Sequence, residues 1–176
     1  MEKKLLVVVD YQNDFVTGSL GFEKAVSLEK NICDKIKTYR ENNDSILFTL
    51  DTHTDTYMET QEGKHLPVPH CIKGTEGAKL FGKLNELITD TDIFIEKETF
   101  GASGLVDYLK QNYFDVIEFV GVVSNICVIS NAVIAKAIQP EALIVVDASC
   151  TASFDDSLNE KSLDVMQGLQ MKVINR

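Results

Sequence analysis

The stretch that decides the fold is residues 119–139, FVGVVSNICVISNAVIAKAIQ. Its first part ends an apolar run, 116–123, in which Glu118 is the one charged residue, and its second part, 126–138, is an apolar segment of helical length. The polar step Ser124-Asn125 between them offers an N-cap, which would put Cys127 in the first helical turn. Free backbone N–H groups and the helix dipole favour a thiolate there. Although most free cysteines are core residues, we predict that Cys127 is a nucleophile at a strand-to-helix turn.

Outward from this unit, the chain alternates strand-like and helix-like segments. Strand-like runs lie at 5–9, 46–50, 93–95, 116–123, 142–146 and 172–174. Helix-like segments lie at 27–42, 79–88, 105–111, 126–138 and 157–169. Six strands alternating with helices predict an α/β fold, a three-layer sandwich in which a six-stranded, mostly parallel sheet carries helices on both faces. A length of 176 residues predicts a single domain, 1–176.

Composition excludes several classes of protein. The net charge of -10 argues against a nucleic-acid binder and against adsorption to anionic membranes. No apolar stretch is long enough to span a bilayer, and Asp10 interrupts the first apolar run before a signal-peptide core forms. The four cysteines are widely spaced without a C-x-x-C pair, so we expect a reducing cytoplasm rather than a disulfide framework.

The helix-like segment 126–138 is apolar almost all round. Such a helix is either deeply buried within its own chain or partly covered by a second subunit. Burial is the simpler interpretation, but we expect a homo-oligomer.

The strand ends carry reactive side chains. Asp10, Asp51 and Lys97 each stand at the end of a predicted strand, and Cys127 follows another. A parallel sheet brings these ends to one edge, where ligands bind in this class of fold. A single acid at a strand end is commonly only solvated, so the convergence is the signal. Asp10 is placed to take the thiol proton and return it to a leaving amine, and Lys97 is expected to lower the pKa values of both groups.

The long irregular loop 52–77 contains every histidine of the chain. One residue separates Asp51 from His53, so in extended backbone both side chains point to the same side. Glu62, His65 and His70 follow within twenty residues. Imidazole and carboxylate together suit Zn²⁺, Mn²⁺ or Fe²⁺. The competing interpretation is a polar loop whose surface histidines bind no ion.

Five segments resemble the isochorismatase-like cysteine hydrolases, and among them the nicotinamidase/pyrazinamidase branch. They are VVVDYQNDF (7–15), DTH (51–53), PVPHCIKGTEG (67–77), Lys97, and GVVSNICV (121–128), in order across nearly the whole chain. The resemblance implies a metal-assisted cysteine amidohydrolase. Its expected reaction converts nicotinamide, and also pyrazinamide, to the acid and ammonia through a thioester.

The resemblance also implies a role for individual residues. The expected catalytic residues are Asp10, Lys97 and Cys127, and the expected metal ligands are Asp51, His53 and His70 with Glu62 as the fourth, where other members carry a histidine. His65 is the competing fourth ligand. Zn²⁺ is the first choice of metal, with Mn²⁺ or Fe²⁺ as alternatives.

The same resemblance implies how the substrate is held. A cis peptide at Val122–Val123 would aim the Val123 N–H, together with that of Cys127, at the substrate oxygen. Phe15, Leu66 and Phe100 are the expected substrate contacts. The branch usually has an aromatic residue in the region of Leu66, and this chain contains no Trp.

Two other functions fit part of the pattern. One is hydrolysis of a different small amide, a carbamoyl compound or an isochorismate-like substrate. Those branches generally lack the metal histidines, so His53 and His70 favour a nicotinamidase. The other is a receiver-type signalling module, which would use Asp10, Asp51 and Lys97 but needs neither thiol nor histidine.

Overall fold

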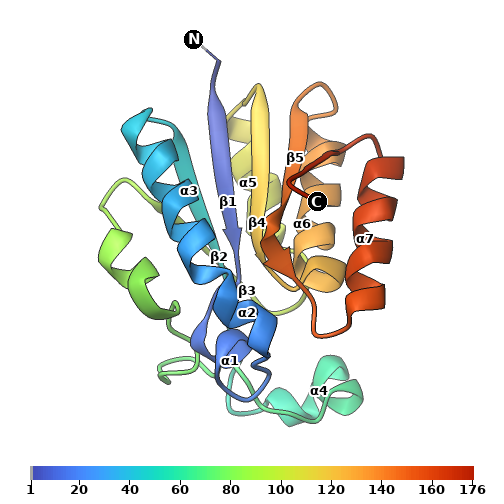
Figure 1. Ribbon diagram of the computed structural model, residues 1–176. Helices are drawn as coiled ribbons and strands as arrows, with labels where there is room; N and C mark the ends of the chain where they lie inside the picture. The colour runs from blue at the N-terminus through green and yellow to red at the C-terminus, as the bar shows by residue number, and fades with distance from the viewer. Residues whose placement is uncertain (1) are drawn as a thin grey trace.

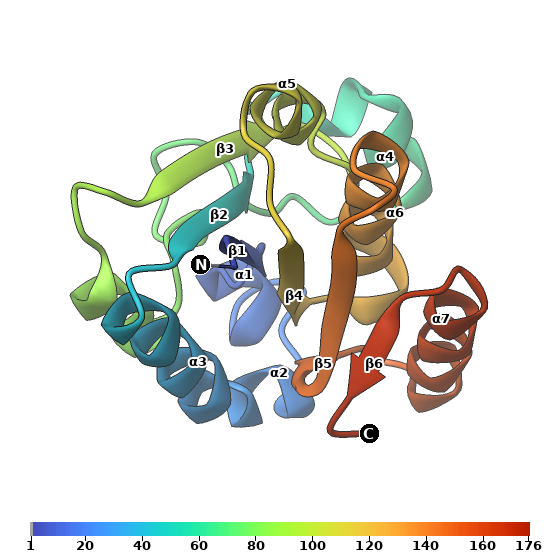
Figure 2. The same ribbon diagram turned by 90° about the horizontal axis from the view of Figure 1, so that it is seen from above.

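The structure, a computed structural model, describes residues 2–176 and contains a six-stranded sheet with helices on both faces (Figures 1 and 2). The strands are β1 (Lys4–Val9), β2 (Ser45–Asp51), β3 (Ile93–Lys97), β4 (Val116–Val122), β5 (Leu143–Ala152) and β6 (Lys172–Ile174). Their order is β3-β2-β1-β4-β5-β6, and every pairing is parallel. The predicted three-layer α/β fold is confirmed.

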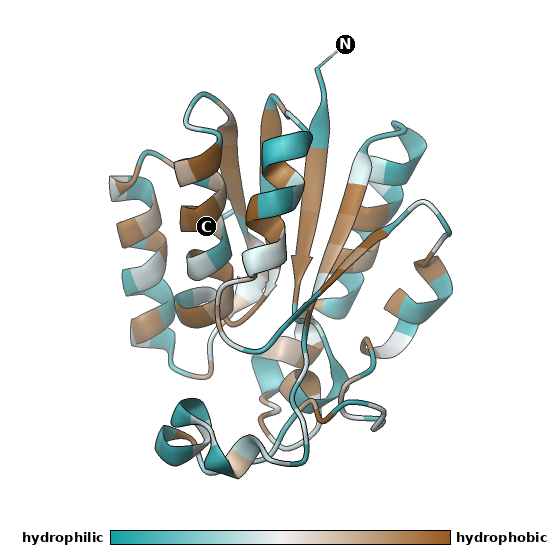
Figure 3. Cartoon of the chain, turned by 180° about the vertical axis from the view of Figure 1, so that it is seen from behind, coloured by the Kyte–Doolittle hydropathy of each residue, from teal (hydrophilic) through white to brown (hydrophobic). Residues whose placement is uncertain are grey.

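Two apolar cores lie on opposite faces of the sheet. One face is covered by α5 (Ser103–Gln111), α6 (Ile129–Ile138) and α7 (Asp156–Gly168), and the other by α2 (Glu23–Ser27), α3 (Glu29–Glu41) and the 3₁₀ helix η2 (Gly82–Leu87). Along β1, Val7 and Val9 enter the first core, while Leu6 and Val8 enter the second. A strand buried on both faces reads as a continuous apolar run, and the strands are accordingly hydrophobic along most of their length (Figure 3).

The strand order reverses between β1 and β4, in the middle of the sheet. In open parallel sheets, ligands bind at this reversal, outside the carboxyl ends of the strands. The short helices α1 (Asn13–Val16) and α4 (Gln61–His65) lie at this edge (Figure 1), with the 3₁₀ turn η1 (Tyr57–Glu59) just before α4. The topology therefore predicts a site between the carboxyl ends of the strands and the helices α1 and α4.

Gly121 allows β4 to lie close to β1 just before this edge. Its φ is +106°, and a Cβ atom built there would lie 2.0 Å from the Val9 carbonyl oxygen. Only glycine fits, because any larger residue would push the two central strands apart.

Several predicted boundaries were wrong for local reasons. The helix expected at 27–42 is present as α3, and a separate short helix, α2, precedes it. The helix expected at 79–88 is only the 3₁₀ segment η2, which starts at Gly82 with a positive φ. Strand β5 continues past 146 to Ala152, and its register with β4 shifts along the way. The polar residues in the part after 146 break the apolar pattern, so the sequence did not show this continuation. The loop 52–77 contains η1 and α4, which are too short to show a period.

The turn after β4 is a π-helical turn, Ser124–Val128, rather than the predicted capped α-helix. Val123 occupies the cap position, and its carbonyl accepts hydrogen bonds from Ile126 N–H and Val128 N–H. The Ser124 hydroxyl instead donates to Asn159 Oδ1 on α7 at 2.7 Å, so it does not cap the helix. Cys127 therefore lies inside a π turn, a feature that is frequent at functional sites.

Helix α6 is buried on one side rather than all round. Its buried residues are Asn131, Ala132 and Ala135, whereas Val133 is 41% exposed. A second subunit could cover this exposed side, and the expected homo-oligomer stays a prediction. No helix within residues 2–176 combines the length and the apolar content that crossing a membrane requires.

Candidate active site

Four side chains that the sequence placed at strand ends lie together at the carboxyl edge. We call Asp10, Asp51, Lys97 and Cys127 the edge cluster, and all four are buried. Asp10 directly follows β1 with a φ of +47°, a conformation that Asp tolerates better than most residues. Its Oδ1 accepts a hydrogen bond from the Thr49 hydroxyl at 2.7 Å, which fixes the carboxyl group against β2.

Lys97 is the centre of the edge cluster. Its Nζ lies 2.7 Å from Asp10 Oδ2, 3.1 Å from Asp51 Oδ1 and 3.8 Å from Cys127 Sγ. The ammonium also donates to the Thr99 carbonyl at 2.8 Å. Burial alone would lower the pKa of Lys97, but the neighbouring carboxylates of Asp10 and Asp51 raise it, so the lysine stays charged.

Lys97 lowers the pKa values of Asp10 and Cys127 in the predicted direction, but burial outweighs its effect and both pKa values are raised. Burial raises the pKa of the Cys127 thiol well above its usual range, the Asp10 charge raises it further, and Lys97 opposes them only in part. Burial likewise raises the pKa of Asp10 against the effect of Lys97. Desolvation disfavours both anions in a site closed to water. The resting cluster therefore holds a protonated thiol next to a carboxyl group able to share its proton.

The second predicted constellation also comes together. Ligand atoms of Asp51, His53 and His70 lie within 4.8 Å of one another, and all three residues are buried. His53 Nε2 lies 2.8 Å from Asp51 Oδ2, and His70 Nε2 lies 3.2 Å from the same oxygen. His70 Nδ1 contacts the Val68 carbonyl at 2.8 Å, so the other ring nitrogen, Nε2, faces Asp51.

The donor set fits a divalent transition-metal ion. Two imidazoles and a carboxylate are a usual set for Zn²⁺, Mn²⁺ or Fe²⁺. His53 Nε2 is buried, and its 2.8 Å contact with Asp51 Oδ2 lacks the geometry of a hydrogen bond, as expected of an atom that faces a metal position. Burial alone would raise the pKa of Asp51, but the neighbouring His53, His70 and Lys97 lower it, so this carboxylate is ionised.

Glu62 is better placed than His65 to be the fourth ligand. Glu62 Oε1 lies 3.8 Å from His70 Nε2 and 3.9 Å from His53 Nε2, and its Oε2 is buried without a partner among residues 2–176. His65, one turn further along α4, is exposed and its Nδ1 contacts the Gln61 carbonyl. Glu62 therefore remains our prediction.

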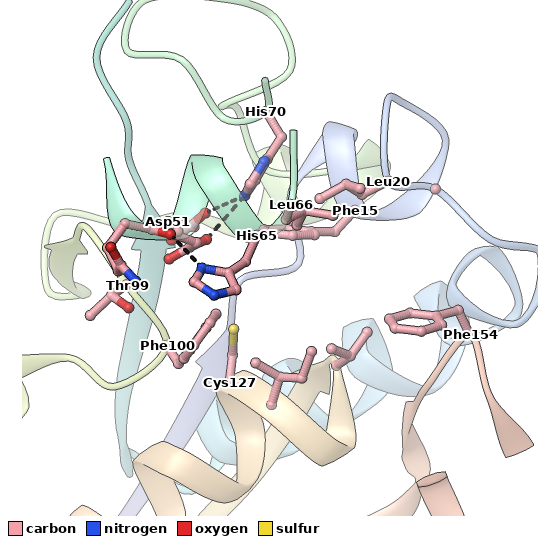
Figure 4. A pocket seen from close by; sticks show the side chains of 15 residues that line it. Phe15, Leu20, Asp51, His65, Leu66, His70, Thr99, Phe100, Cys127 and Phe154 are labelled. Carbon is pink, nitrogen blue, oxygen red and sulfur yellow. Dashed lines mark hydrogen bonds and ion pairs between the residues drawn. The ribbon is translucent and has the colours of Figure 1, made fainter. Parts of the chain in front are cut away.

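One cavity of about 790 Å³ joins the two constellations (Figure 4). Cys127 and Val123 line it on the sheet side, and Asp51 and His70 line it beside α4. The three predicted substrate contacts also line it, namely Phe15, Leu66 and Phe100. The predicted cis peptide between Val122 and Val123 is present at the cavity wall.

Sequence reasoning missed two buried amides that hold the site. Gln12 binds both backbone groups of Asp51, donating to its carbonyl and accepting from its N–H, each at 2.8 Å. Asn131 donates to the Cys127 carbonyl at 2.8 Å and to the Phe100 carbonyl at 3.1 Å, and accepts from Ala102 N–H at 2.9 Å. Both are fully buried, but only Asn131 gave a signal, as a polar residue within the apolar segment 126–138, whereas Gln12 stands among other polar residues.

Comparison with known proteins agrees with this geometry. The sequence model of the isochorismatase domain matches residues 4–176. The isochorismatase family protein PncA of Bacillus subtilis is 32% identical over 164 residues, which cover 87% of this chain and 88% of that protein. The nicotinamidase/pyrazinamidase of Mycobacterium tuberculosis is 25% identical over 169 residues, covering 88% of this chain and 90% of that protein. The crystal structure of the pyrazinamidase/nicotinamidase from Streptococcus mutans superposes with a TM-score of 0.89 at 29% identity, covering 98% and 100% of the two chains.

These comparisons confirm the predicted resemblance and exclude the signalling alternative. Receiver domains have five strands in the order 2-1-3-4-5, whereas this sheet has six in the order β3-β2-β1-β4-β5-β6. The family match spans nearly the whole chain and both buried constellations. The chain therefore belongs to the isochorismatase family and is a hydrolase of that superfamily.

Proposed function

We propose that this protein is a metal-assisted cysteine amidohydrolase that converts nicotinamide to nicotinate and ammonia, and also accepts pyrazinamide. One observation carries the proposal. A thiol, Cys127, and two of the predicted metal ligands, Asp51 and His70, line the same largely apolar cavity. We call Asp51, His53, His70 and Glu62 the metal-ligand group. A flat heteroaromatic amide has a carbonyl for the thiol, a ring nitrogen for the metal, and a ring for the apolar walls.

The first half of the reaction forms a thioester. Asp10 takes the proton of Cys127 as the sulfur attacks the carboxamide carbon, and Lys97, 3.8 Å from the sulfur, stabilises the anion that forms. The backbone N–H groups of Val123 and Cys127 hold the developing oxyanion, each contributing on the order of 3 kcal/mol to lowering the barrier. Asp10 then gives its proton to the departing ammonia.

The second half hydrolyses the thioester. Asp10 takes a proton from water, the hydroxyl adds to the acyl carbon, and the carbon–sulfur bond breaks with return of the proton to Cys127. The raised pKa of Asp10 suits this role, because a carboxylate of higher pKa is a stronger base toward the thiol and toward water. One water is consumed, and one acid and one ammonia are released.

The proposed metal ligands are Asp51, His53, His70 and Glu62. A bound divalent cation, with Zn²⁺ as first choice, supplies a Lewis acid for a ring nitrogen. Phe15 lies edge-on to the His70 ring at a centroid distance of 5.4 Å, which places an aromatic wall beside this group. Phe15, Leu66 and Phe100 are proposed to pack against the ring, in place of the Trp that the chain lacks.

Relatives also support the assignment by name. Proteins called nicotinamidase or nicotinamidase/pyrazinamidase match 97% and 88% of this chain at 23% and 25% identity, in Acinetobacter baylyi and Mycobacterium tuberculosis. Another hydrolase of the superfamily, acting on a carbamoyl compound or a different amide, is the second candidate. The buried His53 and His70 favour the nicotinamidase.

The test is a panel assay of ammonia release from nicotinamide, pyrazinamide and carbamoyl compounds, run beside elemental analysis of the purified protein. We expect nicotinamide and pyrazinamide to be hydrolysed and about one divalent metal ion per chain. Faster release from a carbamoyl compound would establish the second candidate instead.

Chelation tests the metal separately. Removing the metal is expected to abolish nicotinamide hydrolysis, and re-addition of Zn²⁺, Mn²⁺ or Fe²⁺ to restore it. Elemental analysis before and after gives the metal content. A metal-free protein of undiminished activity would contradict the proposed role of the group.

A further inference from the structure

The cavity extends well beyond the reacting groups. Its volume of about 790 Å³ lies in the range that drug-sized ligands occupy, whereas a single-ring carboxamide is far smaller. Figure 4 shows Phe154 at the end of the cavity away from the carboxylates and His70. Part of the cavity therefore lies beyond the ring of nicotinamide.

Two loops build this far end. Leu20 and Gly21 come from the connection between α1 and α2, and Phe154 comes from the connection between β5 and α7. Phe154 is 62% exposed, and its ring packs edge-on against Phe22 at a centroid distance of 6.3 Å. Phe154 and Leu20 together extend the apolar wall of the cavity into solvent, and contiguous exposed apolar surface of this kind marks ligand-binding grooves.

Charge is confined to the other end. The acidic and imidazole groups that line the cavity are Asp51, Glu62, His65 and His70, which come from the metal-ligand group and α4. The far end is lined by Leu20, Gly21, Ile126 and Phe154. A ligand that fills the cavity thus has one polar end and one apolar end.

We propose that this hydrolase prefers aromatic carboxamides that carry an apolar substituent, and that the far end formed by Leu20, Ile126 and Phe154 binds that substituent. The inference rests on the proposed amidase function. With the carboxamide at Cys127 and the ring nitrogen at the metal-ligand group, the substituent stands on a ring carbon remote from that nitrogen. Phe154 and Leu20 are then specificity-determining residues for the proposed reaction.

The test compares nicotinamide with nicotinamide that carries a phenyl group at the 5-position. We expect kcat/KM to be about 10-fold or more higher for the substituted amide, mainly through a lower KM, because added apolar contacts give roughly 10- to 200-fold discrimination. The F154A variant should reduce the ratio of the two kcat/KM values about 10-fold. Y113A is the matched control, since Tyr113 is 57% exposed but does not line the cavity, and its ratio should equal that of the wild type.

The outcomes separate the two proposals. If the wild-type protein releases ammonia from neither amide, the proposed function fails, and the preference falls with it. If it hydrolyses nicotinamide but gains nothing from the phenyl group, only the preference is overturned. If F154A lowers kcat/KM equally for both amides and also changes the molar mass in solution, Phe154 serves subunit contact, and the preference is again overturned.

Discussion

Two lysines of this protein, the buried Lys97 and the partly buried Lys35, each lie between two carboxylates, yet their surroundings differ. In the edge cluster, Lys97 lies 2.7 Å from Asp10 and 3.1 Å from Asp51. On the α3 side of the sheet, Lys35 lies 2.8 Å from Glu118 and 2.7 Å from Asp147. We call Lys35, Glu118 and Asp147 the flank cluster.

The difference lies in what surrounds the paired carboxylates. All four carboxylate oxygens of the flank cluster accept hydrogen bonds or ion pairs, with Tyr39, Ser149 and Asn175 as the additional donors. In the edge cluster, both oxygens of Asp10 are also paired, Oδ1 with the Thr49 hydroxyl and Oδ2 with Lys97, but the thiol of Cys127 lies 3.8 Å from the same lysine and lines the cavity. Paired charges are therefore common to both clusters, whereas a nucleophile that borders a cavity marks only the reactive one.

The largest expected effect comes from removing the sulfur. C127A should lower ammonia release from nicotinamide by about 10⁴-fold or more, because the thioester can no longer form. Circular dichroism and thermal unfolding should show an intact fold. C150A is the matched control, since Cys150 is also a buried free thiol but is absent from the cavity lining, and it should retain activity. Activity of C127A at the level of C150A would refute the nucleophile.

Exchanging each lysine for methionine tests the comparison directly. K97M should lower kcat on nicotinamide by about 10³-fold, because the thiolate and oxyanion lose their nearest charge. K35M should instead lower the free energy of unfolding by roughly 3 kcal/mol, since it leaves two buried carboxylates unpaired, while the folded fraction keeps its kcat. Urea unfolding and steady-state kinetics of both variants give the two numbers. An equal loss of kcat in both would show that the two clusters do not differ in role.

A smaller effect should separate two buried amides on or next to α6. Asn131 binds the Cys127 and Phe100 carbonyls and Ala102 N–H, whereas Gln139 makes the same pattern of one accepted and two donated hydrogen bonds with Phe114, Leu109 and Asn112. N131A and Q139A should both destabilise the fold by about 2–3 kcal/mol. Only N131A should also lower kcat, by about 10- to 100-fold, because it releases the loop that carries Phe100 from the turn that carries Cys127.

A conservative change sharpens that result. N131S keeps a short polar side chain but only one donor, so we expect it to recover part of the kcat lost in N131A. Steady-state kinetics at several nicotinamide concentrations separate kcat from KM. Equal kcat values for N131A and Q139A would show that Asn131 has no positioning role.

The sequence was sufficient for the fold and for the edge cluster because both depend on strand ends. Continuous apolar runs identified the strands, and a parallel sheet brings Asp10, Lys97 and Cys127 to the same edge. It was insufficient where a side chain had two possible partners. Ser124 could cap its own helix or bind Asn159, and only the packing of α7 decides between them.

The direction of the pKa shifts was also beyond the sequence. The charge of Lys97 can be read from the chain, but the desolvation that opposes it depends on how completely the site is covered. The flank cluster was missed for a similar reason. Lys35 and Glu118 are 83 positions apart, and neither stands at the end of a strand.

The smallest expected effect concerns stability in acid and distinguishes Asp147 from Asp10 by sign. Burial alone would raise the pKa of Asp147, but hydrogen bonds from Lys35, Ser149 and Asn175 lower it below its usual value. A carboxylate with a lowered pKa stabilises the fold above the pKa of the unfolded chain, about 3.9, and this contribution is lost as the pH falls through the folded value. Asp10 acts in the opposite sense, since its pKa is raised and its protonation therefore favours the folded state.

The D147N variant should have a free energy of unfolding about 1–3 kcal/mol lower than that of the wild type at neutral pH, and this difference should narrow below about pH 4. Urea unfolding from pH 7 to pH 3 measures it, and a gap that stays constant would show that the ionised Asp147 does not stabilise the fold.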